Sequence, residues 1–162
     1  MDNLFKNKNL YLIAEIGGNH QGSYEKAIEI CPSDTYHIAR YAILLCYLGE
    51  PKKGLLEIER AIRIDPFCSE LILETQGMCY YLIGDYEKAI SSFKKMQIDT
   101  RTSLFYKAAC HQELEQKNLA NDVLELAYNE SGMSIEKFIA TQFFQDEAMK
   151  NTLTNTLEGI TA

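Results

Sequence analysis

Two of the three prolines end similar phrases, and their spacing constrains the fold more than any other feature. The phrases are Ile30-Cys31-Pro32 and Ile64-Asp65-Pro66, so the two prolines lie 34 residues apart. A fixed period of this length is typical of repeat proteins, in which one supersecondary unit is used several times. The stretch between the prolines is therefore predicted to form one structural unit.

Each unit has the pattern of two helices separated by a turn. Apolar residues recur at helical spacing, and Gly49 and Gly84 stand between the two halves of successive units. Small residues such as Gly77 and Ala89 would let the paired helices approach closely. The predicted helices lie within 34–50, 52–64, 69–83 and 86–96.

Two less regular units flank this pair. Residues 23–32 predict a shortened leading half-unit, and residues 101–132 predict a third unit with Glu115 where the turn glycine would stand. The core positions of that third unit are Leu104, Ala108, His111, Ala120, Leu124 and Ala127. Downstream, 134–144 and 146–157 carry apolar residues at helical spacing, and Ser134 is a good N-cap.

The phrase Gly84-Asp85-Tyr86-Glu87-Lys88-Ala89-Ile90, with the 34-residue spacing, resembles the tetratricopeptide repeat. This resemblance implies an all-α fold in which antiparallel helix hairpins stack into a superhelix. It divides the chain into a half-repeat at 23–32 and repeats at about 35–68, 69–100 and 101–132. We expect 133–162 to form a capping helix or pair of helices, because a solenoid needs a polar-backed end.

The same resemblance implies a protein or peptide partner, since tetratricopeptide arrays bind polypeptides in a groove made mainly by their first helices. The groove lacks the Lys, Arg and Asn with which one subclass grips the acidic C-termini of heat-shock chaperones, so we expect an apolar peptide or helix. Alternatively, Tyr47, Met78 and Tyr81 pack between hairpins. The expected groove residues are Tyr36, Ala39, Ile43, Tyr47, Glu74, Met78, Tyr81, Phe105 and Gln112.

A second resemblance covers roughly residues 33 to 160. The phrases at 41–51, 58–66 and 138–146 are similar to the C-terminal repeat region attached to some bacterial class III adenylate cyclases and related signalling proteins. This implies a sensory or interaction module that stands alone, because the cyclase's catalytic domain with its metal-binding aspartates has no counterpart here.

The N-terminus differs in pattern from the repeats. Residues 10–16 predict a strand-like arm, and the phrase at 13–23 resembles the opening strand and loop of the sialic acid synthase family. Glu15, Asn19 and His20 would be the matching site residues. Such a barrel enzyme needs about 250 residues, so we expect no catalysis by this chain alone.

We therefore interpret residues 1–22 as an arm that adds a strand to a partner or to a second copy in a homodimer, or as a relic of gene rearrangement. Two alternatives to the interaction module remain open. One is a truncated or chimeric protein related to sialic acid synthase, and the other is a repeat-type chaperone of secreted proteins.

Composition excludes several function classes. The net charge of -7 and the pI near 5.0 argue against nucleic acid as a partner. The longest apolar run is 42–48, far short of the roughly 20 residues that a membrane-spanning helix needs. Five cysteines without a C-x-x-C pair and three scattered histidines predict no metal site and no cofactor, in a reducing, cytoplasmic setting.

Overall fold

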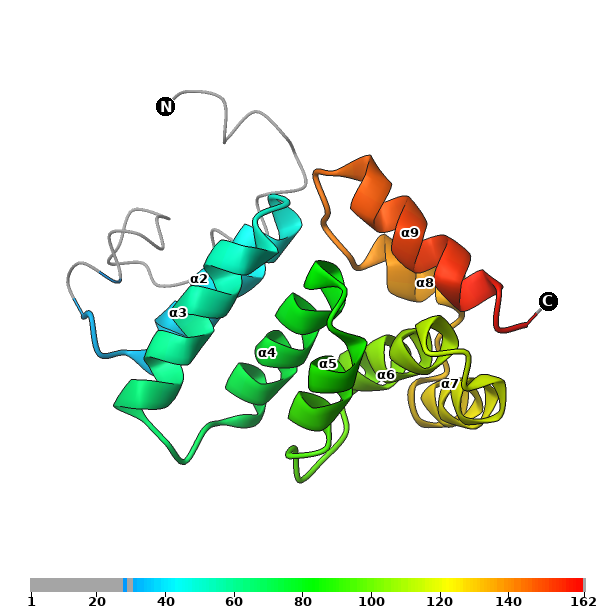
Figure 1. Ribbon diagram of the computed structural model, residues 1–162, viewed down its shortest axis with the longest axis horizontal. Helices are drawn as coiled ribbons and strands as arrows, with labels where there is room; N and C mark the ends of the chain where they lie inside the picture. The colour runs from blue at the N-terminus through cyan, green and yellow to red at the C-terminus, as the bar shows by residue number, and fades with distance from the viewer. Residues whose placement is uncertain (1–27, 29–30, 162) are drawn as a thin grey trace.

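Helix is the regular structure throughout the part of the chain that the structure describes. The computed structural model describes residue 28 and residues 31–161, and no strand occurs among them, which confirms the all-α expectation for this part (Figure 1). The predicted arm and most of the predicted half-repeat lie outside the described residues. The helices are α2 (Thr35–Tyr47), α3 (Pro51–Ile64), α4 (Glu70–Ile83), α5 (Tyr86–Phe93), α6 (Arg101–Glu113), α7 (Lys117–Ser131), α8 (Ile135–Ala140) and α9 (Glu147–Glu158).

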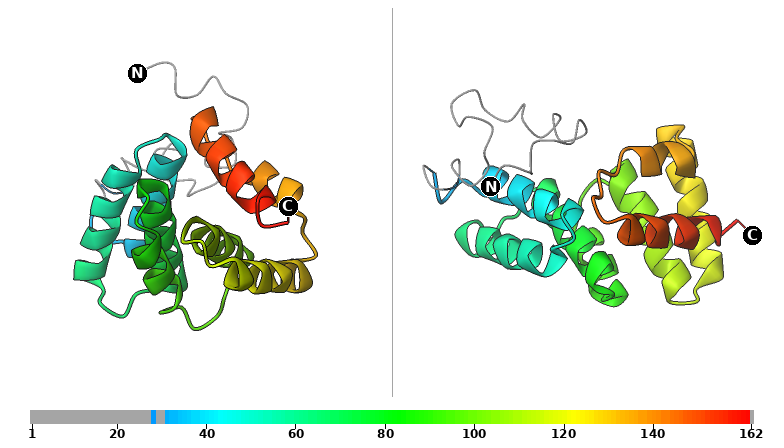
Figure 2. Two further views of the ribbon diagram at one scale, coloured as in Figure 1. Left: turned by 45° about the vertical axis from the view of Figure 1, so that its right-hand side comes forward. Right: turned by 90° about the horizontal axis from the view of Figure 1, so that it is seen from above.

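The first six of these helices form three hairpins. Helices α2 and α3, α4 and α5, and α6 and α7 pack pairwise, and successive hairpins lie side by side (Figures 1 and 2). Helix α4 also packs against both α2 and α6. We call α2, α4 and α6 the first helices, because they form one continuous layer of the molecule.

Helix starts follow the local sequence. Asp34 caps α2 by accepting hydrogen bonds from the N–H groups of Tyr36 and His37 at 3.0 and 3.2 Å. Thr100 and Ser103 form a reciprocal capping box at the start of α6. The expected N-cap of α8, Ser134, accepts from the Lys137 N–H at 3.3 Å.

The three hairpin turns share one backbone geometry. In each turn an N–H donates to the carbonyl five residues earlier, from Glu50 to Leu45, from Asp85 to Tyr80 and from Gln116 to His111. The residue before each donor has a positive φ: 80° at Gly49, 91° at Gly84 and 58° at Glu115. Glu115 therefore adopts the left-handed conformation that glycine adopts without strain.

Glycines inside helices mark the closest contacts between hairpin partners. A Cβ atom on Gly77 would lie only 2.3 Å from Cε1 of Phe93, so the Phe93 ring packs directly on the α4 backbone. On Gly54 it would lie 2.9 Å from the Ala42 carbonyl oxygen. The small residues thus permit close helix packing, as the sequence predicts for Gly77.

Buried apolar side chains form two clusters. The small core joins α2, α3 and the start of α4 through residues such as Ile38, Ile58 and Ile72. The main core extends from α4 to α9 and includes Phe105, Phe138, Leu153 and Leu157. Helices α8 and α9 are therefore part of the main core, as well as the end of the array.

Two helices end earlier than the sequence pattern predicts. Helix α5 ends at Phe93 instead of Met96, and α8 ends at Ala140, so the helical spacing through Phe144 is not realised. Beyond Ala140, Thr141 and Gln142 close tight turns onto Phe138 and Ile139, and Asp146 caps a new helix through the Ala148 N–H at 2.8 Å. Packing of the intervening phenylalanines on Tyr47 overrides their local helical spacing.

Candidate polypeptide-binding face

One end of the predicted groove is open to solvent, on the first half of α2. Tyr36 is 47% exposed, and the Arg40 side chain folds over it. The Arg40 guanidinium lies 5.2 Å from the Tyr36 ring centre and donates to its hydroxyl at 3.1 Å. Ile43, the next predicted groove residue along α2, is half-buried, whereas Ala39 is buried in the small core. This open end combines an aromatic ring, a cation and an aliphatic side chain.

A half-buried carboxyl group lies near the middle of α2, where it interacts electrostatically with both Arg40 and Tyr47. Glu74 of α4 accepts a hydrogen bond from the Thr100 hydroxyl at the start of α6. Burial raises the pKa of Glu74, and the positive charges of Arg40 and Arg101 offset part of that rise. The carboxyl group is thus held between the helices in an environment that disfavours its charge.

The other end of α2 is covered by the chain itself. Rings of Phe143 and Phe144 meet the Tyr47 ring edge-on, with centres 6.0 and 5.3 Å away. The Gln145 N–H donates to the Tyr47 carbonyl oxygen at 2.8 Å. Burial raises the pKa of the Tyr47 phenol, which keeps it neutral.

The remaining predicted groove residues also contact protein. Met78 and Tyr81 are buried, and Tyr81 meets Tyr106 of the next hairpin with ring centres 5.2 Å apart, as the packing alternative expects. Phe105 stacks on Phe138 of α8 at 4.2 Å. Gln112 donates to the Gly159 carbonyl oxygen at 3.3 Å. A role in ligand contact stays a prediction for all of these residues.

The structure thus divides the predicted site residues into two groups. Tyr36 is exposed and Ile43 and Glu74 are half-buried without an aromatic cover, whereas Tyr47 joins the covered group at the other end of the same helix. Arg40 and Thr100, which hydrogen-bond to Tyr36 and Glu74, complete this first group, although the sequence analysis did not select them. The position of Arg40, four residues after Tyr36, is the signal that could have identified it.

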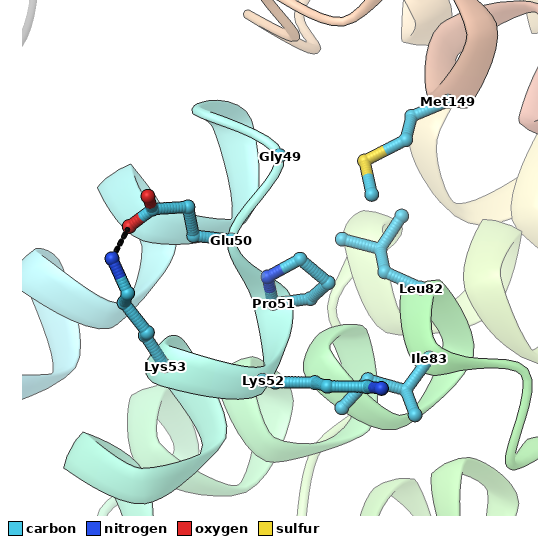
Figure 3. A pocket seen from close by; sticks show the side chains of 8 residues that line it. All are labelled: Gly49, Glu50, Pro51, Lys52, Lys53, Leu82, Ile83 and Met149. Carbon is cyan, nitrogen blue, oxygen red and sulfur yellow. Dashed lines mark ion pairs between the residues drawn. The ribbon is translucent and has the colours of Figure 1, made fainter.

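A shallow hollow of about 400 Å³ opens where α9 meets the α2–α3 turn and the end of α4 (Figure 3). Apolar side chains of Pro51, Leu82 and Met149 form its floor, while Glu50 and Lys53 pair at its rim with 2.9 Å between Oε2 and Nζ. Its lining residues are Gly49, Glu50, Pro51, Lys52, Lys53, Leu82, Ile83 and Met149. The sequence could not indicate this hollow, because tertiary packing alone brings α9 to α4.

Within 31–161 and at residue 28, no group of three or more His, Cys, Asp or Glu could hold a metal ion. Cys46 and Cys79 are buried with their Sγ atoms 3.3 Å apart, and both are free thiols. Glu15, Asn19 and His20 lie outside the described residues. No helix of the described part has both the length and the apolar character needed to cross a membrane.

Comparison of the chain with family models, curated proteins and solved structures gave no match. The three family resemblances therefore rest only on the phrases quoted for them.

Proposed function

We propose that the chain is a non-catalytic interaction module of the tetratricopeptide type, which binds a polypeptide segment across its first helices. The observation that carries this proposal is the open end of α2, where the exposed Tyr36 ring and the half-buried Arg40 guanidinium form an aromatic and cationic surface, with the half-buried Glu74 within electrostatic reach of Arg40. Hairpins packed side by side, with their first helices in one layer, provide the support for such a surface.

The polar groups at this surface suit recognition better than proton transfer. Arg40 is engaged with the Tyr36 hydroxyl, and Glu74 with the Thr100 hydroxyl. Each group therefore has a fixed position and an internal partner that a peptide group could replace. The guanidinium can donate to a peptide carbonyl or carboxylate, and the carboxyl group can accept from a peptide N–H.

Aromatic and arginine side chains carry much of the binding energy in protein interfaces. Tyr36 and the guanidinium that covers it would together contact a peptide side chain, and Ile43 would extend the apolar contact toward the centre of the face. The expected ligand is an extended segment with at least one large apolar side chain. Binding should depend only weakly on salt, because a single cation contributes.

The proposal is tested by selecting peptides from a random display library against the purified chain and measuring their Kd by fluorescence anisotropy. Tyr36→Ala should raise Kd about tenfold, the scale of one interface hot spot. Leu56→Ala is the matched control, since Leu56 is a large apolar residue on α3, 63% exposed and outside the proposed site. Its Kd should equal that of the wild type.

Two results would contradict the proposal. One is a library that yields no saturable binder at any salt concentration. The other is a set of binders whose affinity responds to Leu56→Ala but not to Tyr36→Ala, which would place the binding surface on α3.

A further inference from the structure

The linker between α8 and α9, residues 141–146, lies along the first helices where a bound polypeptide would lie. It leaves α8 beside α6, where Phe138 stacks on Phe105. It ends beside the α2–α3 turn, where a Cβ atom on Gly49 would lie 3.7 Å from the Asp146 Cβ. The linker contains no helix or strand and reaches from α8 toward α2 (Figures 1 and 2). The linker therefore reaches from α6, the last of the three first helices, to the end of α2.

The linker contacts the face through main chain and aromatic side chains together. The Tyr106 hydroxyl donates to Oε1 of Gln142 at 3.2 Å. Phe143 and Phe144 both meet the Tyr47 ring, and the next residue, Gln145, donates its N–H to the Tyr47 carbonyl oxygen. Protein grooves recognise extended peptides through this combination of backbone hydrogen bonds and side-chain pockets.

Burial is uneven along the linker. Phe138 of α8 and Leu153 and Leu157 of α9 are buried in the main core. In the linker, Phe144 also belongs to the main core and Gln142 is buried, whereas Phe143 and its contact Tyr47 are half-buried, and Gln145 and Asp146 are exposed. An external segment that replaces the linker must therefore supply an aromatic ring for the buried position of Phe144.

We propose that residues 141–146 are a built-in ligand: they occupy the site beside Tyr47, and an external polypeptide of the same chemistry binds there by displacing them. The partner carries two adjacent aromatic residues followed by an amide and a carboxylate, in extended conformation. This inference rests on the proposed function and adds its regulation. Only molecules in which the linker has left the site can bind the external polypeptide. Its apparent Kd is therefore its intrinsic Kd divided by the fraction of molecules in which the site is open.

The test uses the full chain and a fluorescent probe peptide with the sequence of residues 138–147. The opened variant, Phe143→Ser with Phe144→Ser, should bind the probe at least about tenfold more tightly than the wild type. A probe with serine at both phenylalanine positions should not bind. Adding Tyr47→Ala to the opened variant should abolish binding. Circular dichroism and size-exclusion chromatography establish that each variant is folded.

A disulfide variant tests the same inference without removing the aromatic pair. In Gly49→Cys with Asp146→Cys, the 3.7 Å separation falls in the range that disulfides accept. The oxidised form should hold the linker on the face and bind the probe at least about tenfold more weakly than the reduced form of the same protein. Mass spectrometry of the oxidised protein checks the pairing against the native cysteines. If the opened variant does not fold, this pair of states decides the question.

Four results separate the outcomes. The inference is overturned if the folded opened variant binds the probe no more tightly than the wild type. If the opened variant does not fold, the inference is overturned when the reduced disulfide variant binds the probe no more tightly than its oxidised form. It is also overturned if the opened variant forms concentration-dependent dimers instead, because a second copy is then the occupant. If either of these results is found, library-selected peptides that bind through Tyr36 would still support the proposed function. If no peptide binds the wild type or any variant, both the proposed function and this inference are overturned.

Discussion

Tyr36 and Tyr47 project from the same side of α2, yet their surroundings differ. The Tyr36 ring is 47% exposed and is contacted by Arg40 and the His37 ring, whereas the Tyr47 ring is met by two phenylalanines of the linker. Helical spacing places both residues on one face. What covers that face is decided by a segment about a hundred residues later in the chain. A repeat pattern thus predicts the direction of a side chain but not its exposure.

The largest expected effect comes from the covered part of the face, at Phe138 of α8. Phe138→Ala should lower the free energy of unfolding by about 3–5 kcal/mol, because it removes a ring that is 1% exposed and stacked on Phe105. Tyr36→Ala, at the open end, should cost less than about 1 kcal/mol. Urea denaturation measures both, with Phe67→Ala at a 95% exposed site as the control. Equal losses at the two ends would remove the distinction between them.

The next largest effect concerns α4, the helix between the two ends. Gly77→Ala should lower the free energy of unfolding by about 1–3 kcal/mol, because its Cβ would overlap the buried Phe93 ring. Ser91→Ala, on the exposed side of α5, is the control and should have little effect. Thermal denaturation of both variants measures the difference. A neutral Gly77→Ala would mean that α4 and α5 pack less closely than the structure places them.

Much of this arrangement follows from local sequence. The hairpins follow from helical spacing and from glycines at the turns, and capping residues such as Asp34 and Ser134 set helix starts. The local sequence does not predict the non-helical path of residues 141–146, because Phe143 and Phe144 continue the helical spacing of α8. Their position depends on a tertiary contact with Tyr47 and on the capping of α9 by Asp146. Of the candidate site, the sequence therefore predicts the residues on the face and misses the segment that covers half of it.

A smaller effect on the free energy of unfolding is expected at two hairpin turns. One is the turn at Gly49, beside the covered end of α2, and the other is the turn at Glu115 in the third hairpin. Glu115→Gly should raise the free energy of unfolding by about 0.5–1 kcal/mol, because a φ of 58° strains any residue with a Cβ. Gly49→Ala should lower it by about 1 kcal/mol for the same reason, since the φ of Gly49 is 80°. Chemical denaturation of the two variants gives the opposite signs directly. The same sign for both would contradict a shared turn geometry.

The smallest effect is a pH dependence of stability, and its sign follows from Glu74, which lies between the two ends of the face. Burial raises the pKa of this carboxyl group above the ordinary value of 4.5, so the folded protein holds its proton at pH values where the unfolded chain has lost it. The folded state then binds more protons, and stability falls as the pH rises from 4.5 through the pKa of the folded state. Glu74→Gln removes the titration and should abolish this part of the decline, while Glu130→Gln, at an exposed site on α7, should retain it. Urea denaturation of the three proteins across this pH range measures the difference. A decline that persists in Glu74→Gln would mean that burial of this carboxyl group between the helices does not cause it.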